Sequence, residues 1–65
     1  MKGTVKFFKP LKGYGFIAPD GNKEDHFVHR NELLNSVSLD KGDRVEFDSV
    51  LEDRGYQAVN VRKID

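Results

Sequence analysis

The chain has 65 residues, no cysteine, and 11 basic against 11 acidic residues, so its formal net charge is zero. A chain of this length forms a single domain, here residues 1–65, and buries only about 60% of the surface that its unfolded form exposes, so its core is thin. The lack of cysteine excludes a disulfide framework and a thiolate metal site, and the lack of a membrane-length apolar run or a signal-peptide pattern leads us to expect a cytoplasmic protein with no membrane partner.

Residues 2–9 predict a strand, because β-branched and aromatic residues are interleaved with lysine. Pro10 and Gly13 then predict a loop. No acidic residue interrupts the lysines at positions 2, 6, 9 and 12, so positive charge extends up to the next strand although the net charge is zero. Lysines on an edge strand also deter aggregation, and this run alone does not establish a binding site.

Residues 14–18 and 26–29 predict two more strands, which run antiparallel and are joined through a turn at residues 19–22. The Asp-Gly pair in this turn is a strong hairpin signal. Successive side chains of a strand point to opposite faces. One face of each strand therefore carries rings and the other carries Ile17 or Val28. The ring faces hold Tyr14, Phe16, Asp25, Phe27 and His29.

The second half of the chain predicts two longer strands. Residues 31–34 could form one helical turn with Asn31 as its cap, and residues 35–42 form a connection. Residues 44–50 alternate polar with apolar side chains, a turn follows at residues 53–55, and residues 56–64 form the last strand. Five short strands close into a small barrel to hide their edges. We expect its core to contain Val5, Phe8, Ile17, Val28, Leu39, Val45, Phe47, Ala58 and Val61.

Exposed rings beside lysines suit single-stranded nucleic acid, because every nucleobase has a flat face that stacks on an aromatic ring. Each base stacked in this way contributes about 1–3 kcal/mol, and lysine contacts to phosphate add a term that depends on salt. Gly13 and Gly15 beside the rings leave room for close approach, although they could also simply serve a turn and a bulge. A double helix would bind poorly, since its base faces are already stacked.

The two ring-bearing stretches resemble the bacterial-type cold-shock domain family. The family's first ribonucleoprotein motif resembles Lys12-Gly13-Tyr14-Gly15-Phe16-Ile17, and its second resembles Asp25-His26-Phe27-Val28-His29. Residues 3–8 and 55–61 also match, so the resemblance covers essentially the whole chain. It implies an all-β, five-stranded antiparallel OB-type barrel. It also implies a nucleic-acid chaperone that binds single-stranded RNA and DNA, keeps RNA unfolded, and takes part in the cold-shock response and in regulation of transcription or translation.

The resemblance also implies which residues bind the nucleic acid. Phe7 stands where the family usually has tryptophan, Lys9 where it usually has asparagine, and Arg30 where an aromatic residue is common. The smaller phenyl ring leads us to expect weaker binding, whereas the planar guanidinium of Arg30 can still stack on a base. The binding residues implied are Lys6, Phe7, Lys12, Tyr14, Phe16, Asp25, Phe27, His29, Arg30, Arg54 and Gln57.

Strict alternation conflicts with the resemblance in the first strand. Alternation places Phe7 on the same face as Val5, whereas the resemblance places Phe7 outside and Val5 and Phe8 inside. A bulge or strong coil near Lys6 would reconcile the two.

The histidines invite a different interpretation, as a metal site or an acid–base pair. His26 and His29 are three apart on one strand, so they point to opposite faces and cannot share a metal ion. Neither a nucleophile nor a substrate-binding cradle lies near His29 and Asp25. We therefore expect that the protein is not an enzyme and uses neither a cofactor nor a small-molecule substrate. We expect His26 to face inward, as a neutral side chain near the barrel end, where the family usually has valine.

A protein-interaction module on the same barrel is the alternative function, because exposed rings with a polar rim also suit a protein partner. The lysines of the first strand favour nucleic acid. We expect a monomer, and exchange of strands into a dimer is left open.

Overall fold

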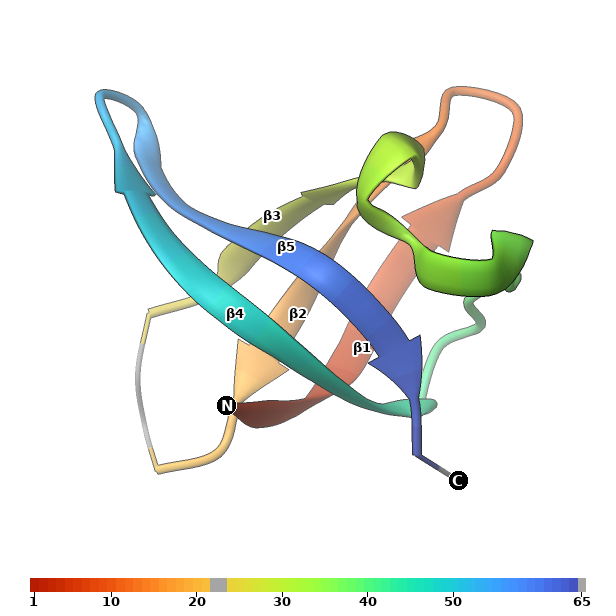
Figure 1. Ribbon diagram of the computed structural model, residues 1–65, viewed down its shortest axis with the longest axis horizontal. Coiled ribbons are helices and arrows are strands. Elements are labelled where there is room, and N and C mark those ends of the chain that lie inside the picture. Colours follow the sequence, from red (N-terminus) through yellow and green to blue (C-terminus); the bar gives the residue numbers. More distant parts are fainter. Residues whose placement is uncertain (22–23, 65) are drawn as a thin grey trace.

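The computed structural model describes residues 1–21 and 24–64, which form a closed barrel (Figure 1). Two short 3₁₀ turns, η1 (Arg30–Glu32) and η2 (Leu34–Ser36), connect the third and fourth strands of this barrel. The strands begin and end within two residues of their predicted bounds, and Asn22 of the predicted turn lies outside the described residues. The five strands within these ranges are β1 (Lys2–Lys9), β2 (Tyr14–Pro19), β3 (His26–His29), β4 (Arg44–Glu52) and β5 (Gly55–Lys63).

The strands follow one another around the barrel in the order β1-β2-β3-β5-β4, with β4 next to β1. The predicted five-stranded OB-type barrel is confirmed, with one correction to the antiparallel pairing. Around the part of the barrel that the structure describes, four pairs are antiparallel, and β3 pairs with β5 in parallel through Phe27 opposite Gln57 and Val28 opposite Ala58. A closed ring with an odd number of strands cannot alternate direction at every pair, so one pair has to be parallel.

The core lies between the long β4–β5 hairpin, in front in Figure 1, and the β1–β3 strands behind it. Phe8, which we expected inside, is partly buried and packs against this core, as do Leu33 and Val37. His26 is also buried, as predicted. The buried hydrophobic residues are all ones that the sequence placed inside: Val5, Ile17, Val28, Leu39, Val45, Phe47, Ala58 and Val61.

A bulge in β1 sets the direction of its rings. Val5 pairs with Ile17 and Phe7 pairs with Phe16, so β1 advances two residues where β2 advances one. Lys6 is the extra residue, which confirms the bulge expected there. As a result Val5 faces the core and Phe7 faces outward.

The turn after β3 begins one residue earlier than predicted, and its cap is His29 rather than Asn31. Nδ1 of His29 accepts a hydrogen bond of 3.1 Å from the backbone N–H of Asn31. The backbone of His29 is extended, as a cap requires, whereas Asn31 already lies inside the turn.

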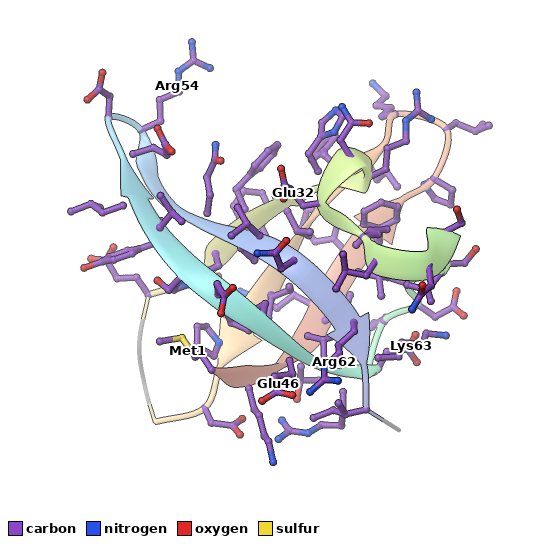
Figure 2. The ribbon with its side chains drawn as sticks, in the orientation of Figure 1. Met1, Glu32, Glu46, Arg54, Arg62 and Lys63 are labelled. Carbon is purple, nitrogen blue, oxygen red and sulfur yellow. The ribbon has the colours of Figure 1, made fainter. Side chains whose placement is uncertain are left out.

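Ion pairs lie at the end of the barrel away from the β4–β5 turn. Glu46 of β4 and Arg62 of β5 point toward one another, as Figure 2 shows, and form such a pair. Lys63 pairs with Asp43 at 3.2 Å.

In the residues that the structure covers, no helix is long and apolar enough to cross a membrane.

Candidate nucleic-acid interface

Three phenylalanines form a row across the outer face of β1, β2 and β3. Phe7 lies opposite Phe16, and Phe16 lies opposite Phe27. The ring centroids of these pairs are 5.6 and 5.7 Å apart, close enough for direct contact between aromatic rings. Gln57 of β5 extends the row, since it lies opposite Phe27.

A second row lies beside the first and consists of Lys9, Tyr14 and His29. Its tyrosine ring stacks on Phe27 at a centroid distance of 5.8 Å and meets the edge of Phe7 at 6.4 Å. The four rings of Phe7, Tyr14, Phe16 and Phe27, which we call the ring surface, are therefore in continuous contact. All four are at least partly exposed, and Phe7 is the most open, with 37% of its surface accessible.

Glycine at position 15 allows β1 and β2 to approach each other beneath the ring surface. A Cβ atom placed on Gly15 would lie 2.3 Å from the carbonyl oxygen of Phe7 and 2.8 Å from Cα of Phe8. The close approach that the sequence suggested is therefore made by the neighbouring strand. Gly13 has a positive φ of 79° and serves the loop.

Positive charge beside the ring surface is partly compensated. Nζ of Lys6 lies 2.7 Å from Oδ2 of Asp25, and the two side chains are 52% and 41% exposed. Exposed pairs contribute only about 0–1 kcal/mol, so a phosphate can compete for this lysine. Lys9, which was not among the predicted binding residues, holds its Nζ 5.9 Å from the ring centroid of Phe7. Its position two residues after Phe7 was the signal in the sequence.

The β1–β2 loop adds two cations at one end of the ring surface. Lys12 is exposed in this loop. The backbone N–H of Arg30 donates a hydrogen bond of 2.9 Å to the carbonyl of Gly13. The side chain of Arg30 lies so close to Gly13 that a Cβ placed on Gly13 would be 2.9 Å from Nε of Arg30. Arg30 is thus held against Gly13, the residue that follows Lys12 in the loop.

A pocket of about 380 Å³ lies at the other end of the ring surface, toward the β4–β5 turn. Arg54 projects from the tip of this turn, as Figure 2 shows. Glu24 and Tyr56 also line the pocket but were not predicted from the sequence, where their only signal is their position beside Asp25 and Gln57. The pocket is lined by Phe16, Glu24, Asp25, Phe27, Arg54, Gly55, Tyr56 and Gln57.

The buried ring of His26 supports this pocket from within. Nδ1 of His26 is 2.8 Å from the backbone carbonyl oxygen of Glu24, and Nε2 is 2.7 Å from Oγ of Ser49. Its ring stacks on that of Tyr56 with centroids 5.0 Å apart. His29 is exposed on the opposite face of β3, so the two histidines do not converge. Among the described residues, no group of three or more His, Cys, Asp or Glu side chains could hold a metal ion.

The structure thus gathers the predicted binding residues along one side of the barrel. Lys12 and Arg30 lie at the loop end, and Arg54 lies at the turn end beside the pocket. Between them, on β1, β2, β3, the segment before β3 and the adjoining part of β5, lie Lys6, Phe7, Tyr14, Phe16, Asp25, Phe27, His29 and Gln57.

The chain is similar to known proteins in both structure and sequence. A solved structure of Drosophila Unr CSD456 superposes with a TM-score of 0.80 at 28% identity, over 98% of this chain and 26% of that longer chain. The major cold shock protein of Micrococcus luteus is 47% identical over 64 residues, which cover 95% of this chain and 96% of that protein. Cold shock protein CspA of Staphylococcus aureus is 46% identical over 65 residues, 97% of each chain.

The family resemblance drawn from the sequence is confirmed by a family model. The model of the 'Cold-shock' DNA-binding domain matches residues 1–64. The chain therefore belongs to the cold-shock domain family.

Proposed function

We propose that this protein binds single-stranded RNA and DNA and acts as a chaperone that keeps RNA unpaired. The ring surface is the observation that carries this proposal, because its four rings touch one another across three strands while their neighbours fill the core. Successive bases of a single strand can stack on such a surface whatever their identity. The family match and the similarity to bacterial cold shock proteins support the same function.

Binding would use stacking and phosphate contacts together. The rings take the base faces, His29 adds a further flat ring at the edge, and Lys12 and Arg30 meet phosphates at the loop end. A base held on the rings cannot pair within its own RNA. Binding therefore competes with intramolecular base pairing and needs neither ATP nor a cofactor.

The same chemistry suggests the cellular setting. A binder that tolerates many sequences would act in the cytoplasm on RNA whose structure hinders transcription or translation, above all in the cold, when base pairing is strongest. Such a protein catalyses no covalent reaction. A monomer suffices, because the whole ring surface lies on one chain.

A salt titration tests this proposal. A labelled strand of seven thymidines is titrated with wild-type protein, with Phe27→Ala and with Leu51→Ala, at several salt concentrations, and a duplex of the same length is the control. Leu51 is 67% exposed on β4 and lies outside the ring surface, so Leu51→Ala is a matched loss of an exposed apolar side chain. We expect salt to weaken binding, and Phe27→Ala to lose at least about 1 kcal/mol, roughly fivefold in Kd.

Two results would oppose the proposal. If folded Phe27→Ala binds as well as wild type, the ring surface does not stack bases. If no single strand binds, or if binding does not depend on salt, the alternative of a protein-interaction module takes its place, since counterion release accompanies nucleic-acid binding.

A further inference from the structure

The pocket at the turn end of the ring surface differs in chemistry from the rings beside it. We propose that it is a base-reading subsite that takes guanine from the bound single strand. This inference rests on the proposed function and adds a preferred base at one position of a strand that is otherwise held without regard to sequence.

The shape of the pocket suits one base of a strand that already lies on the rings. Phe16 and Phe27 belong both to the ring surface and to the pocket wall, so a strand stacked on the rings passes the pocket mouth. Its volume of about 380 Å³ lies near the lower end of small-ligand sites, which span roughly 300–1,000 Å³. Arg54 at the mouth can meet the phosphate of the base that enters.

The wall of the pocket that Tyr56 forms is aromatic and is held in place by packing. Tyr56 is partly buried, and its ring stacks on His26, which is 2% exposed. A ring that is fixed by packing binds a flat base without a further loss of side-chain freedom. The pocket therefore offers aromatic side chains from β2, β3 and β5 to the faces and edges of one base.

The polar groups of the pocket select among the bases. Glu24 and Asp25 both line the pocket, and each carries a carboxylate, which, when it is ionised, can only accept hydrogen bonds. Guanine has two adjacent donors, N1–H and the N2 amino group, which match the two oxygens of one carboxylate. Adenine and cytosine place an acceptor nitrogen beside their amino group, and thymine and uracil flank their single N–H with carbonyls. A carboxylate in this pocket therefore favours guanine.

Glu24 is held through its backbone, and Asp25 is held through its side chain. The ring of His26 holds the carbonyl oxygen of Glu24 at 2.8 Å, and Nζ of Lys6 holds Oδ2 of Asp25 at 2.7 Å. Because Asp25 is already paired with a cation, Glu24 is the better candidate to receive the two donors of guanine. The geometry thus assigns Glu24 as the residue that sets the preference.

The test compares the affinity for strands that differ in one base. Strands of seven thymidines with a single deoxyguanosine, deoxyadenosine or deoxycytidine at each position in turn are titrated against the all-thymidine strand. We expect one position at which guanine tightens binding by about fivefold or more, as a bidentate base contact does. Replacing that guanine by hypoxanthine, which lacks the N2 amino group, should remove most of the gain with no change in the protein.

Variants then locate the preference in the protein. Glu24→Gln should bring the ratio of guanine to thymidine affinity close to one, while binding of the all-thymidine strand does not weaken. Glu52→Gln is the matched control, because it makes the same charge change at an exposed residue outside the pocket and should keep the wild-type ratio.

The outcomes separate the two proposals. If the all-thymidine strand binds and no position prefers guanine, the subsite is refuted and the proposed function stands. If folded Glu24→Gln keeps the wild-type ratio, the assignment of the preference to Glu24 is refuted and the proposed function stands. If the hypoxanthine strand binds as tightly as the guanine strand, the carboxylate contact is refuted. If no strand binds, both proposals fail.

Discussion

The hydroxyl oxygen of Ser49 lies 2.7 Å from Nε2 of His26, a ring that is almost completely buried. The other ring nitrogen faces the carbonyl of Glu24, which can only accept, so in the neutral imidazole Nδ1 carries the proton and Nε2 accepts from Ser49. This one hydrogen bond thus satisfies a buried acceptor and joins β3 to β4 behind the pocket. Within the described residues, no buried side-chain nitrogen or oxygen lacks a partner.

We expect Ser49→Ala to lower the free energy of unfolding by about 1–3 kcal/mol, because it leaves Nε2 of His26 buried without a donor. Urea denaturation followed by circular dichroism measures this loss. Ser38→Ala, at an exposed residue of the connection before β4, should change stability by no more than about 0.5 kcal/mol. Adding His26→Val to Ser49→Ala should recover part of the loss, and equal stabilities of the single and double variants would contradict the role of this bond.

Gly15→Ala should destabilise the barrel by about 3 kcal/mol or more, because its methyl group would meet the backbone of β1 and neither strand can yield. Gly42→Ala is the comparison. Gly42 has a φ of 93°, and a Cβ there would have no atom of the described structure within 4 Å, so only backbone strain of about 1–2 kcal/mol is expected. Similar losses in the two variants, measured by urea denaturation, would show that β1 and β2 can separate.

Acid should weaken the fold through carboxylates that are bound to cations or to backbone N–H groups. The hydrogen bond from Arg44 holds the pKa of Asp20 below its ordinary 3.8, and the hydrogen bond from Arg62 holds the pKa of Glu46 below its ordinary 4.5. The backbone N–H of Asp40, and then Lys63, lower the pKa of Asp43 in the same way. A pKa that is lower in the folded state contributes stability that is complete above the unfolded value and is lost as the pH falls through the folded one.

The free energy of unfolding should therefore stay level down to about pH 5 and fall below pH 4.5, then more steeply below 3.8, as each carboxylate is protonated. Asp20→Asn should be less stable than wild type at neutral pH and should lose less on acidification. Urea midpoints measured between pH 7 and pH 2 check this. Parallel curves for the two proteins over the whole range would mean that the contact with Arg44 adds nothing.

Local patterns in the sequence predicted the strands and three of the four rings of the ring surface, those of Tyr14, Phe16 and Phe27, because alternation within a strand separates the two faces. They failed where partners come from distant parts of the chain. The pairing of Lys6 with Asp25 joins residues 19 apart, so a count of charges along the first strand overstated its positive field. The parallel β3–β5 pair and the pocket beside it likewise depend on how the barrel closes.

The bulge at Lys6 explains why alternation alone misplaced Phe7, whereas the resemblance placed it correctly on the outside. A single extra residue reverses every side chain that follows it, and residues 2–9 carry no glycine or proline after Gly3 to mark the place. The predicted cap of the turn after β3, Asn31, was wrong for a related reason. Asparagine is the more common cap, but the extended backbone at His29 decides the position.

Replacing Phe7 by tryptophan should strengthen binding of single strands. Phe7 is the most exposed ring of the ring surface and contacts both Tyr14 and Phe16, so a larger indole would extend the stacking area while keeping these neighbours. We expect a gain of about 0.5–1 kcal/mol, a fraction of the roughly 1–3 kcal/mol that a stacked base contributes. The chain has no tryptophan, so the new indole reports binding through its fluorescence.

Leu51→Trp provides the control, since it places an exposed indole on β4 outside the ring surface. Titration with a strand of seven thymidines should quench the fluorescence of Phe7→Trp strongly and that of Leu51→Trp weakly, and only the former should bind more tightly than wild type. Equal quenching in both variants would show that bases do not gather on the ring surface. Strong quenching of Phe7→Trp without a gain in affinity would instead mean that the contacts of Phe7 with Tyr14 and Phe16, rather than its ring area, limit stacking at this position.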